Sequence, residues 1–232
     1  MKQSQNYQYN SQRLIFNFKD KKYTFSFSQI LIFLVVSPLL SILIYLFLKL
    51  RINYWIYNLT SAQIVLILNA LFNLNSEVII SSNLSIFPSI FIPNNPFNEN
   101  YAITANCIAA PVFSIMISII ICIPSSKLLL EKKEFVWRKV KALIVSIGGI
   151  YVLNIFRIVF LIFFNFNGIP FEFIHESLFF LSAVIGALYF VIILKLWLPE
   201  SFISIYYFYR LIVKKWKTRG SFQKENDNII RY

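Results

Sequence analysis

The chain has 232 residues, of which 58% are hydrophobic and only 14% are charged, and it contains 25 phenylalanines. This composition excludes an ordinary soluble domain and predicts an all-α polytopic membrane protein with one membrane domain. The net charge of +12 would suggest nucleic-acid binding in a soluble protein, but here the basic residues flank apolar segments, as lipid-facing anchors do. We therefore expect contacts with membrane lipids and no nucleic-acid partner.

The N-terminal part of the chain predicts a tail, a first span and an ambiguous segment. Residues 1–28 are polar and are expected to form a cytoplasmic tail. Residues 29–48 form the first predicted span, which Pro38 is expected to kink. No small-residue cleavage site follows this run, so we expect it to stay as an uncleaved anchor. Residues 52–74 are apolar but interrupted by polar side chains, which fits either a second span or an amphipathic helix at the membrane surface.

The middle of the chain changes from an irregular segment to further spans. Residues 75–105 lack a helical period and predict short strands, in the manner of a β-hairpin, at 78–80, 85–87 and 101–105. The remaining predicted spans are 107–123, which has Pro111 in its first turns, 142–164 and 177–196. A basic loop at 125–141, a turn at 165–174 and a basic aromatic tail at 199–232 connect or follow them.

The distribution of basic residues orients these segments. Lys and Arg are absent between Arg51 and Lys127 and again between Arg157 and Lys195. Because cytoplasmic loops are rich in Lys and Arg, both stretches should contain the outer segments. The chain is thus expected to be a multi-pass protein of the cell membrane, with about four spans in a domain over 29–198 and an outer segment at 52–105. Lys49 and Arg51 oppose this arrangement, so five spans with the N-terminus outside remain an alternative.

One predicted span carries a polar pair. Asn154 and Arg157 are three residues apart and share a helix face within an apolar run. An arginine inside a span costs about 3 kcal/mol and must face protein or a wet cavity. Cys107 and His175, the single histidine, should lie at the outer ends of their own spans. The topology therefore predicts that a thiol, a guanidinium and an imidazole meet at the outer membrane face.

These three groups suit nucleophilic catalysis. The thiolate of Cys107 would attack a carbonyl, and His175 would take the thiol proton and return it to a leaving amine. Arg157 would stabilise the thiolate or the oxyanion of a tetrahedral intermediate. The dipole at the N-terminus of a helix is also expected to stabilise the negative charge of the Cys107 thiolate.

Other polar residues have supporting or structural interpretations. Asn106 and Asn154 are candidates for lining the site, and Glu172 and Glu176 flank His175, where they would either orient the imidazole or stay solvated. Cys122, near the opposite end of its span, is expected to be a small apolar filler. The sequence predicts no cofactor and no metal.

The order of these motifs resembles the exosortase/archaeosortase family. The matching pieces are Asn106-Cys107-Ile108, the stretch from Asn154 to Ile158, and Phe173-Ile174-His175. The resemblance implies a membrane cysteine transpeptidase or protease, with Cys107 as nucleophile, Arg157 as the family's arginine and His175 as its histidine. Many members have Ser-Gly after the cysteine, where this chain has Ile108-Ala109.

The resemblance also implies the partners of such an enzyme. Its substrates would be secreted proteins that end in a short motif, a membrane helix and a basic tail, and a lipid or another amine or hydroxyl would accept the new carboxyl end. Two alternatives come from other classes of protein. One is a small transporter subunit that binds an anion or a lipid through Arg157, and the other is a non-catalytic membrane scaffold.

Overall fold

The computed structural model describes residues 9–10, 13–14, 16–18, 21–23, 25–80, 87–97, 100–125, 132–210 and 213. Its principal helices are α1 (Phe27–Leu48), α2 (Tyr54–Phe72), α3 (Ala110–Cys122), α4 (Lys132–Phe166) and α5 (Phe171–Trp197). In this part of the chain, four helical segments are long and apolar enough to cross a membrane: Ser28–Leu48, Arg51–Phe72, Lys133–Phe166 and Phe171–Trp197. These segments indicate a multi-pass membrane protein.

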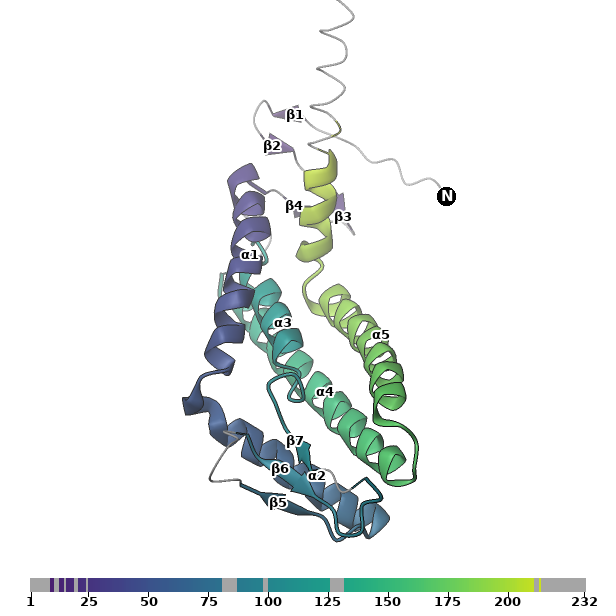
Figure 1. The fold of residues 1–232 in the computed structure, drawn as a ribbon. Coiled ribbons are helices and arrows are strands. Elements are labelled where there is room, and N and C mark those ends of the chain that lie inside the picture. The colour runs from purple at the N-terminus through teal and green to yellow at the C-terminus, as the bar shows by residue number, and fades with distance from the viewer. Residues whose placement is uncertain are drawn as a thin grey trace, which may run out of the picture.

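Four of the helices form the body of the molecule. α1 packs on α3, α3 packs on α4, and α4 packs on α5, so α4 lies between α3 and α5 (Figure 1). The outward faces of α1 and α5 carry exposed large apolar side chains, for example Leu43 and Phe180, which suits a lipid environment. Pro38 lies within α1, and the helix continues on both sides of it.

α2 lies across one end of this body, between α4 and a small sheet (Figure 1). The 3₁₀ turn η1 (Arg51–Asn53) separates it from α1, and the Tyr151 hydroxyl of α4 donates a 2.7 Å hydrogen bond to Gln63 of α2. This placement suits the surface helix that the charge pattern favours. By length and composition α2 also qualifies as a span, whereas α3 has only 13 residues.

The sheet consists of β5 (Glu77–Ile79), β6 (Ser89–Phe91) and β7 (Tyr101–Ala102), antiparallel in the order β5-β6-β7. The expected short strands between α2 and α3 are thus present. The middle strand follows Pro88 instead of preceding it, because proline has no N–H for a ladder and suits the start of a strand. Residues 81–86, most of the strand predicted at 85–87, lie outside the described residues.

Two helices begin earlier than predicted. α4 begins at Lys132, so residues 132–141 are helical and not part of a loop. This stretch lacks Pro and Gly and is rich in good helix formers. α5 begins at Phe171, directly after Pro170, because proline suits a helix start and Glu172 favours the positive end of the helix dipole.

The two terminal regions also contain structure that the sequence did not predict. Short antiparallel pairs join β1 (Tyr9–Asn10) to β2 (Arg13–Leu14) and β3 (Phe16–Phe18) to β4 (Lys21–Tyr23). Residues 200–210 are helical and pack on the start of α1 through a small core of Phe25, Ile30, Ile203 and Tyr207. The packed body therefore extends beyond residue 198, where the tail was expected to begin.

Candidate active site

Cys107 lies in a separate turn that precedes α3. The backbone N–H groups of Cys107 and Ile108 donate to the carbonyl of Thr104, which makes one short helical turn. Ala109 then adopts the left-handed conformation (φ 57°), and the N–H groups of Ala109 and Ala110 donate back to Asn106 and Ala105. This is the hydrogen-bond pattern that closes many helix C-termini. α3 begins three residues later than predicted, so Cys107 lies outside its first turn and the expected benefit from its dipole is lost.

Pro111 explains this break. In a continuous helix the N–H of residue 111 would donate to the carbonyl of Cys107, but proline has no N–H and its ring would clash with that carbonyl. The freed carbonyl must find another donor. It accepts a 2.5 Å hydrogen bond from Nδ2 of Asn154, which is buried on α4. Pro111 and Asn154 together therefore fix the Cys107 turn against α4.

The thiol itself has polar neighbours. Sγ of Cys107 lies 3.5 Å from Oγ1 of Thr104 and donates to the carbonyl of Ala102 at 3.7 Å. The side chain is half-buried, which leaves part of it accessible. Thr104 was not anticipated as part of the site. Its position three residues before the cysteine was the available signal, because a helical turn brings such residues together.

Arg157 is one helical turn beyond Asn154 on α4 and reaches the same site. Its guanidinium interacts electrostatically with Cys107 and lies 5.8 Å from the centre of the Phe179 ring on α5. Nε of Arg157 is buried and makes no hydrogen bond, and among the described residues no carboxylate pairs with this cation. Arg157 and Cys107 are thus close enough to interact electrostatically, but no hydrogen bond joins them in the described structure, and their catalytic pairing stays a prediction.

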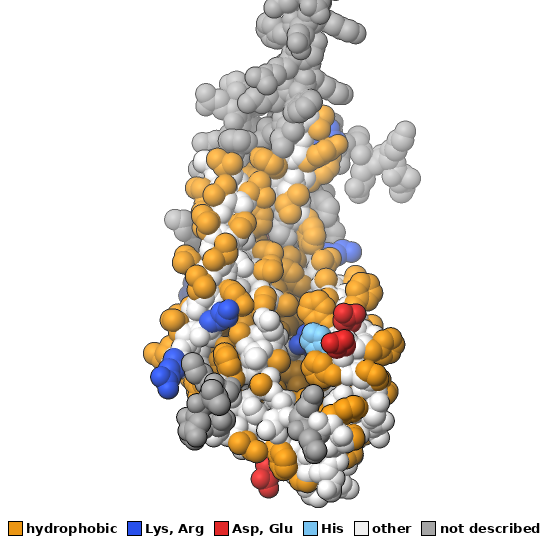
Figure 2. Space-filling view, viewed as in Figure 1, with side chains coloured by type: hydrophobic (Ala, Val, Ile, Leu, Met, Phe, Trp, Pro, Cys, Tyr) orange, Lys and Arg blue, Asp and Glu red, His pale blue; other side chains and the backbone are white. Residues whose placement is uncertain are grey.

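His175 lies on the exposed side of α5 and shares one aromatic neighbour, Phe179, with Arg157. Its ring stacks between Phe171 and Phe179, with centroid distances of 5.5 Å and 6.4 Å. Phe179 therefore contacts both His175 and Arg157. Figure 2 shows basic and acidic side chains beside the histidine on this face. No hydrogen bond joins His175 to Cys107, and both residues are described. The imidazole therefore lies near the site but is not a hydrogen-bond partner of the thiol.

The remaining predicted residues are peripheral. Asn106, Glu172 and Glu176 are exposed, and neither acid hydrogen-bonds to His175 in the described structure. Within the described ranges, no three His, Cys, Asp or Glu side chains gather closely enough to hold a metal ion. The chemistry available here is therefore that of a thiol, an imidazole and a guanidinium.

The strand that leads to Cys107 is anchored to α4. The hydroxyl of Tyr101 on β7 donates a 2.5 Å hydrogen bond to Oδ1 of Asn165, near the end of α4, and both side chains are buried. Nδ2 of Asn165 donates to the carbonyl of Ile169 in the turn before α5. One asparagine thus connects the segment of Cys107 with the turn that precedes His175. No sequence pattern indicated this contact, because asparagines are common throughout the chain.

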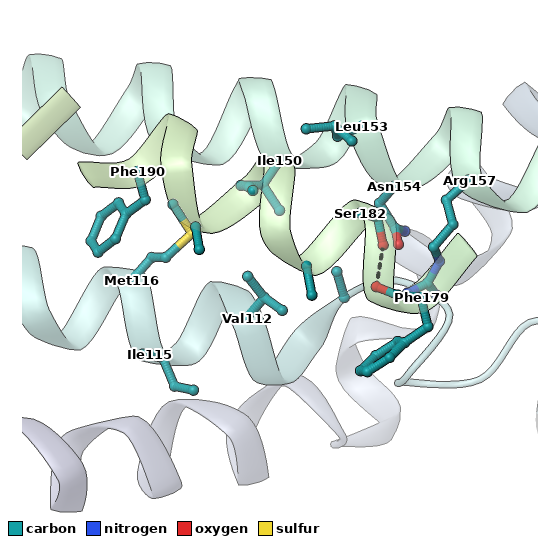
Figure 3. A pocket seen from close by; sticks show the side chains of 14 residues that line it. Val112, Ile115, Met116, Ile150, Leu153, Asn154, Arg157, Phe179, Ser182 and Phe190 are labelled. Carbon is teal, nitrogen blue, oxygen red and sulfur yellow. Dashed lines mark hydrogen bonds between the residues drawn. The ribbon is translucent and has the colours of Figure 1, made fainter. Parts of the chain in front are cut away.

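A narrow pocket extends from the site between α3, α4 and α5 (Figure 3). Its volume is about 250 Å³, and Asn154, Arg157 and Ser182 supply the polar side chains of its lining. Figure 3 shows these three at one end and Met116 and Phe190 toward the other. The hydroxyl of Ser182 is used locally, since it donates to the carbonyl of Phe179.

Comparisons of the chain with protein-family models, with curated proteins and with solved structures found no match.

Proposed function

We propose that the protein is a membrane-embedded cysteine transpeptidase or protease of the exosortase/archaeosortase kind. It would act on the C-terminal sorting signals of secreted proteins at the outer face of the cell membrane. The observation that carries this proposal is the electrostatic interaction of Cys107 with an arginine that has no carboxylate partner among the described residues. A buried cation is costly, and the charge that would balance it is one that appears during a reaction or arrives with a ligand.

The proposed reaction begins with the transfer of the Cys107 thiol proton to His175. The thiolate sulfur then bonds to the carbonyl carbon of the scissile peptide, and the electron pair of the C=O bond moves to oxygen. The Arg157 guanidinium stabilises this negative charge, as it would the thiolate before attack. When the C–N bond breaks, the leaving amine takes the proton from His175 and a thioester remains on Cys107.

The second half of the reaction releases the product. An amine or hydroxyl of the acceptor, or water in a protease, attacks the thioester carbonyl and gives its proton to His175. The C–S bond then breaks, and the thiolate recovers that proton. In this scheme Asn154 holds the carbonyl of Cys107, so it positions the nucleophile without touching the substrate.

The test compares the cell-surface proteins of cells that carry the wild-type chain with those of cells that carry Cys107→Ala. Mass spectrometry of protein C-termini should show a set of new termini, each upstream of an apolar helix and a basic tail, only in the wild-type cells. Cys122→Ala is the matched control and should preserve these termini. If Cys107→Ala leaves every terminus unchanged while the protein is inserted at the wild-type level, the proposal is wrong.

A further inference from the structure

The pocket beside the site has the form of a channel for an apolar chain. α3 supplies Val112 and Met116, α4 supplies Ile150, and α5 supplies Ala183 and Ala187, so the walls are apolar over most of their length. The α5 wall leaves room in the pocket because its side chains are small, at Ser182, Ala183, Gly186 and Ala187. A side chain at Gly186 would lie 3.0 Å from Ile150, which shows how closely α5 approaches α4 at this point.

The volume limits what can enter. An α-helix with its side chains is about 10 Å wide, so a further transmembrane helix cannot fit inside the pocket. A cavity of about 150 Å³ holds a benzene molecule in another protein, so a volume of about 250 Å³ suits a segment of one hydrocarbon chain. Such a chain is available in every bilayer at the depth of these three helices.

The cation at one end of the pocket indicates that the head group of a ligand would be an anion. Arg157 lines the pocket, its Nε is buried without a hydrogen bond, and the structure supplies no carboxylate for it in the described part of the chain. The guanidinium fork pairs well with phosphate oxygens. Asn154 is neutral, and one of the two N–H groups of its Nδ2 already donates to the carbonyl of Cys107, so the positive charge at this end comes from Arg157. A ligand with an anionic head and an apolar chain would pair with Arg157 at one end and fill the apolar part of the pocket.

We infer that the pocket binds one acyl chain of a phosphate-bearing membrane lipid, with the phosphate on Arg157. The chain lies between α3 and α5 toward Met116 and Phe190, and the headgroup lies beside the turn that carries Cys107. This binding does not require the peptidase reaction. It gives the buried charge of Arg157 a resident partner in the absence of substrate.

Photo-crosslinking of the purified full-length protein tests this inference. The probe is a phosphatidic acid with a diazirine in one acyl chain, and the comparison probe is the diacylglycerol with the same chains. Phosphatidic acid should label α3 or α5 around Met116 and Phe190, and diacylglycerol should label them about tenfold less, as expected for the loss of one charge-assisted contact. Inorganic phosphate in excess should not abolish labelling if the chain contributes to binding.

Two variants and a matched control separate the pocket from general lipid contact. Ala187→Phe fills the pocket and should abolish labelling, and Arg157→Gln should reduce labelling by phosphatidic acid to the diacylglycerol level. Leu188→Phe is adjacent on α5, where the side chain is 60% exposed and does not line the pocket, so it should leave labelling unchanged. Equal labelling by both probes, or persistence of labelling in Ala187→Phe, would overturn the inference.

The same measurement on Cys107→Ala keeps this inference separate from the proposed function. Labelling of the pocket in Cys107→Ala should equal that of the wild type. If labelling follows the expected pattern while the cellular C-termini do not change, the lipid site stands and the peptidase proposal fails. If the termini change as proposed while labelling is absent or nonspecific, the lipid inference fails alone.

Discussion

Buried or half-buried cations lie near both ends of α4. The two ends differ in whether the protein supplies an acceptor for these cations. Near the start of α4, Arg138 forms an ion pair with Glu200, whose carboxylate is only 1% exposed. Lys139 donates to two carbonyls at the C-terminal end of α3, at 2.7 Å and 2.8 Å. Arg157, near the other end, has no such acceptor in the described structure. The first pair of cations holds helices together, whereas Arg157 is available to a ligand or a developing charge.

The two cysteines repeat this contrast. Cys122 packs against an apolar core that includes Phe33 and Ile120, and it also interacts electrostatically with Lys139, whose ammonium is already bonded to two carbonyls. Cys107 lies among a threonine hydroxyl, a backbone carbonyl and the charge of Arg157. Each cysteine thus has a cation nearby, but in the described structure the thiol of Cys107 also has polar neighbours, whereas that of Cys122 packs among apolar side chains. Matched pairs of variants test whether the two cations and the two cysteines differ in role.

The largest expected effect is the loss of activity in Cys107→Ala. Proteolytic processing should fall below detection, because no other group can form the thioester, while Cys122→Ala should keep the wild-type rate. The measurement is the fraction of a processed secreted protein, with insertion of the variant checked by membrane fractionation.

Thiol labelling of intact cells tests the same contrast without a substrate. A membrane-impermeant maleimide should react with Cys107 in Cys122→Ala and should not react with Cys122 in Cys107→Ala. Labelling of Cys122 alone would mean that the topology is the reverse of the one predicted.

The next effect is on stability. Glu200→Ala leaves Arg138 without its buried partner and should lower the free energy of unfolding by about 3 kcal/mol. Arg157→Met should cost far less, or stabilise the protein, because that guanidinium loses no ion pair. Thermal unfolding of the detergent-solubilised variants gives both values.

A double variant controls for unrelated damage near Glu200. Replacing the pair together, as Arg138→Met with Glu200→Leu, should recover most of the lost stability. Equal losses of unfolding free energy in Glu200→Ala and Arg157→Met would show that Arg157 stabilises the fold as much as the Arg138–Glu200 pair does. The proposed difference between the two ends of α4 would then be wrong.

A third effect concerns the carbonyl of Cys107. Asn154→Leu removes its donor and should cost about 1–3 kcal/mol, the usual penalty for an unsatisfied buried acceptor, and it should also slow processing. Pro111→Ala supplies the N–H that proline lacks, so the double variant should regain stability by extending α3 to Cys107. Recovery of stability without recovery of processing would show that the separate turn itself is needed for activity.

The sequence predicted the apolar helices of a membrane protein because these depend on local patterns, whereas the catalytic roles of the site residues stay a prediction. Apolar runs of sufficient length marked α1, α4 and α5, and Arg157 was conspicuous within such a run. Asn154, three residues earlier, lines the same pocket as Arg157, as their shared helix face predicts, but its bond to the carbonyl of Cys107 was not predicted.

The sequence did not predict contacts that depend on the packing of distant segments. The bond from Tyr101 to Asn165 and the approach of Phe179 to both Arg157 and His175 join parts of the chain that no periodicity relates. The turn at Cys107 could have been predicted from the sequence, because Pro111 removes one specific hydrogen bond. The apolar run continues through this break, and hydrophobicity therefore extended the predicted helix three residues too far.

The smallest effect tests the backbone of that turn. Ala109 has φ 57°, a conformation that costs a residue with a Cβ about 1 kcal/mol and costs glycine nothing. Ala109→Gly should therefore change the free energy of unfolding by only about 0.5 kcal/mol, since relief of this cost offsets the lost burial of a methyl group worth about 0.8 kcal/mol. Thermal unfolding again provides the measurement.

The neighbouring residue provides the control. Ala110→Gly, at the first position of α3 with ordinary helical backbone, gains no such relief and should lose about 1 kcal/mol. Ala109→Val should lose more than either glycine variant, because a β-branched residue resists positive φ. If Ala109→Gly is as destabilised as Ala110→Gly, the left-handed turn does not exist in the protein.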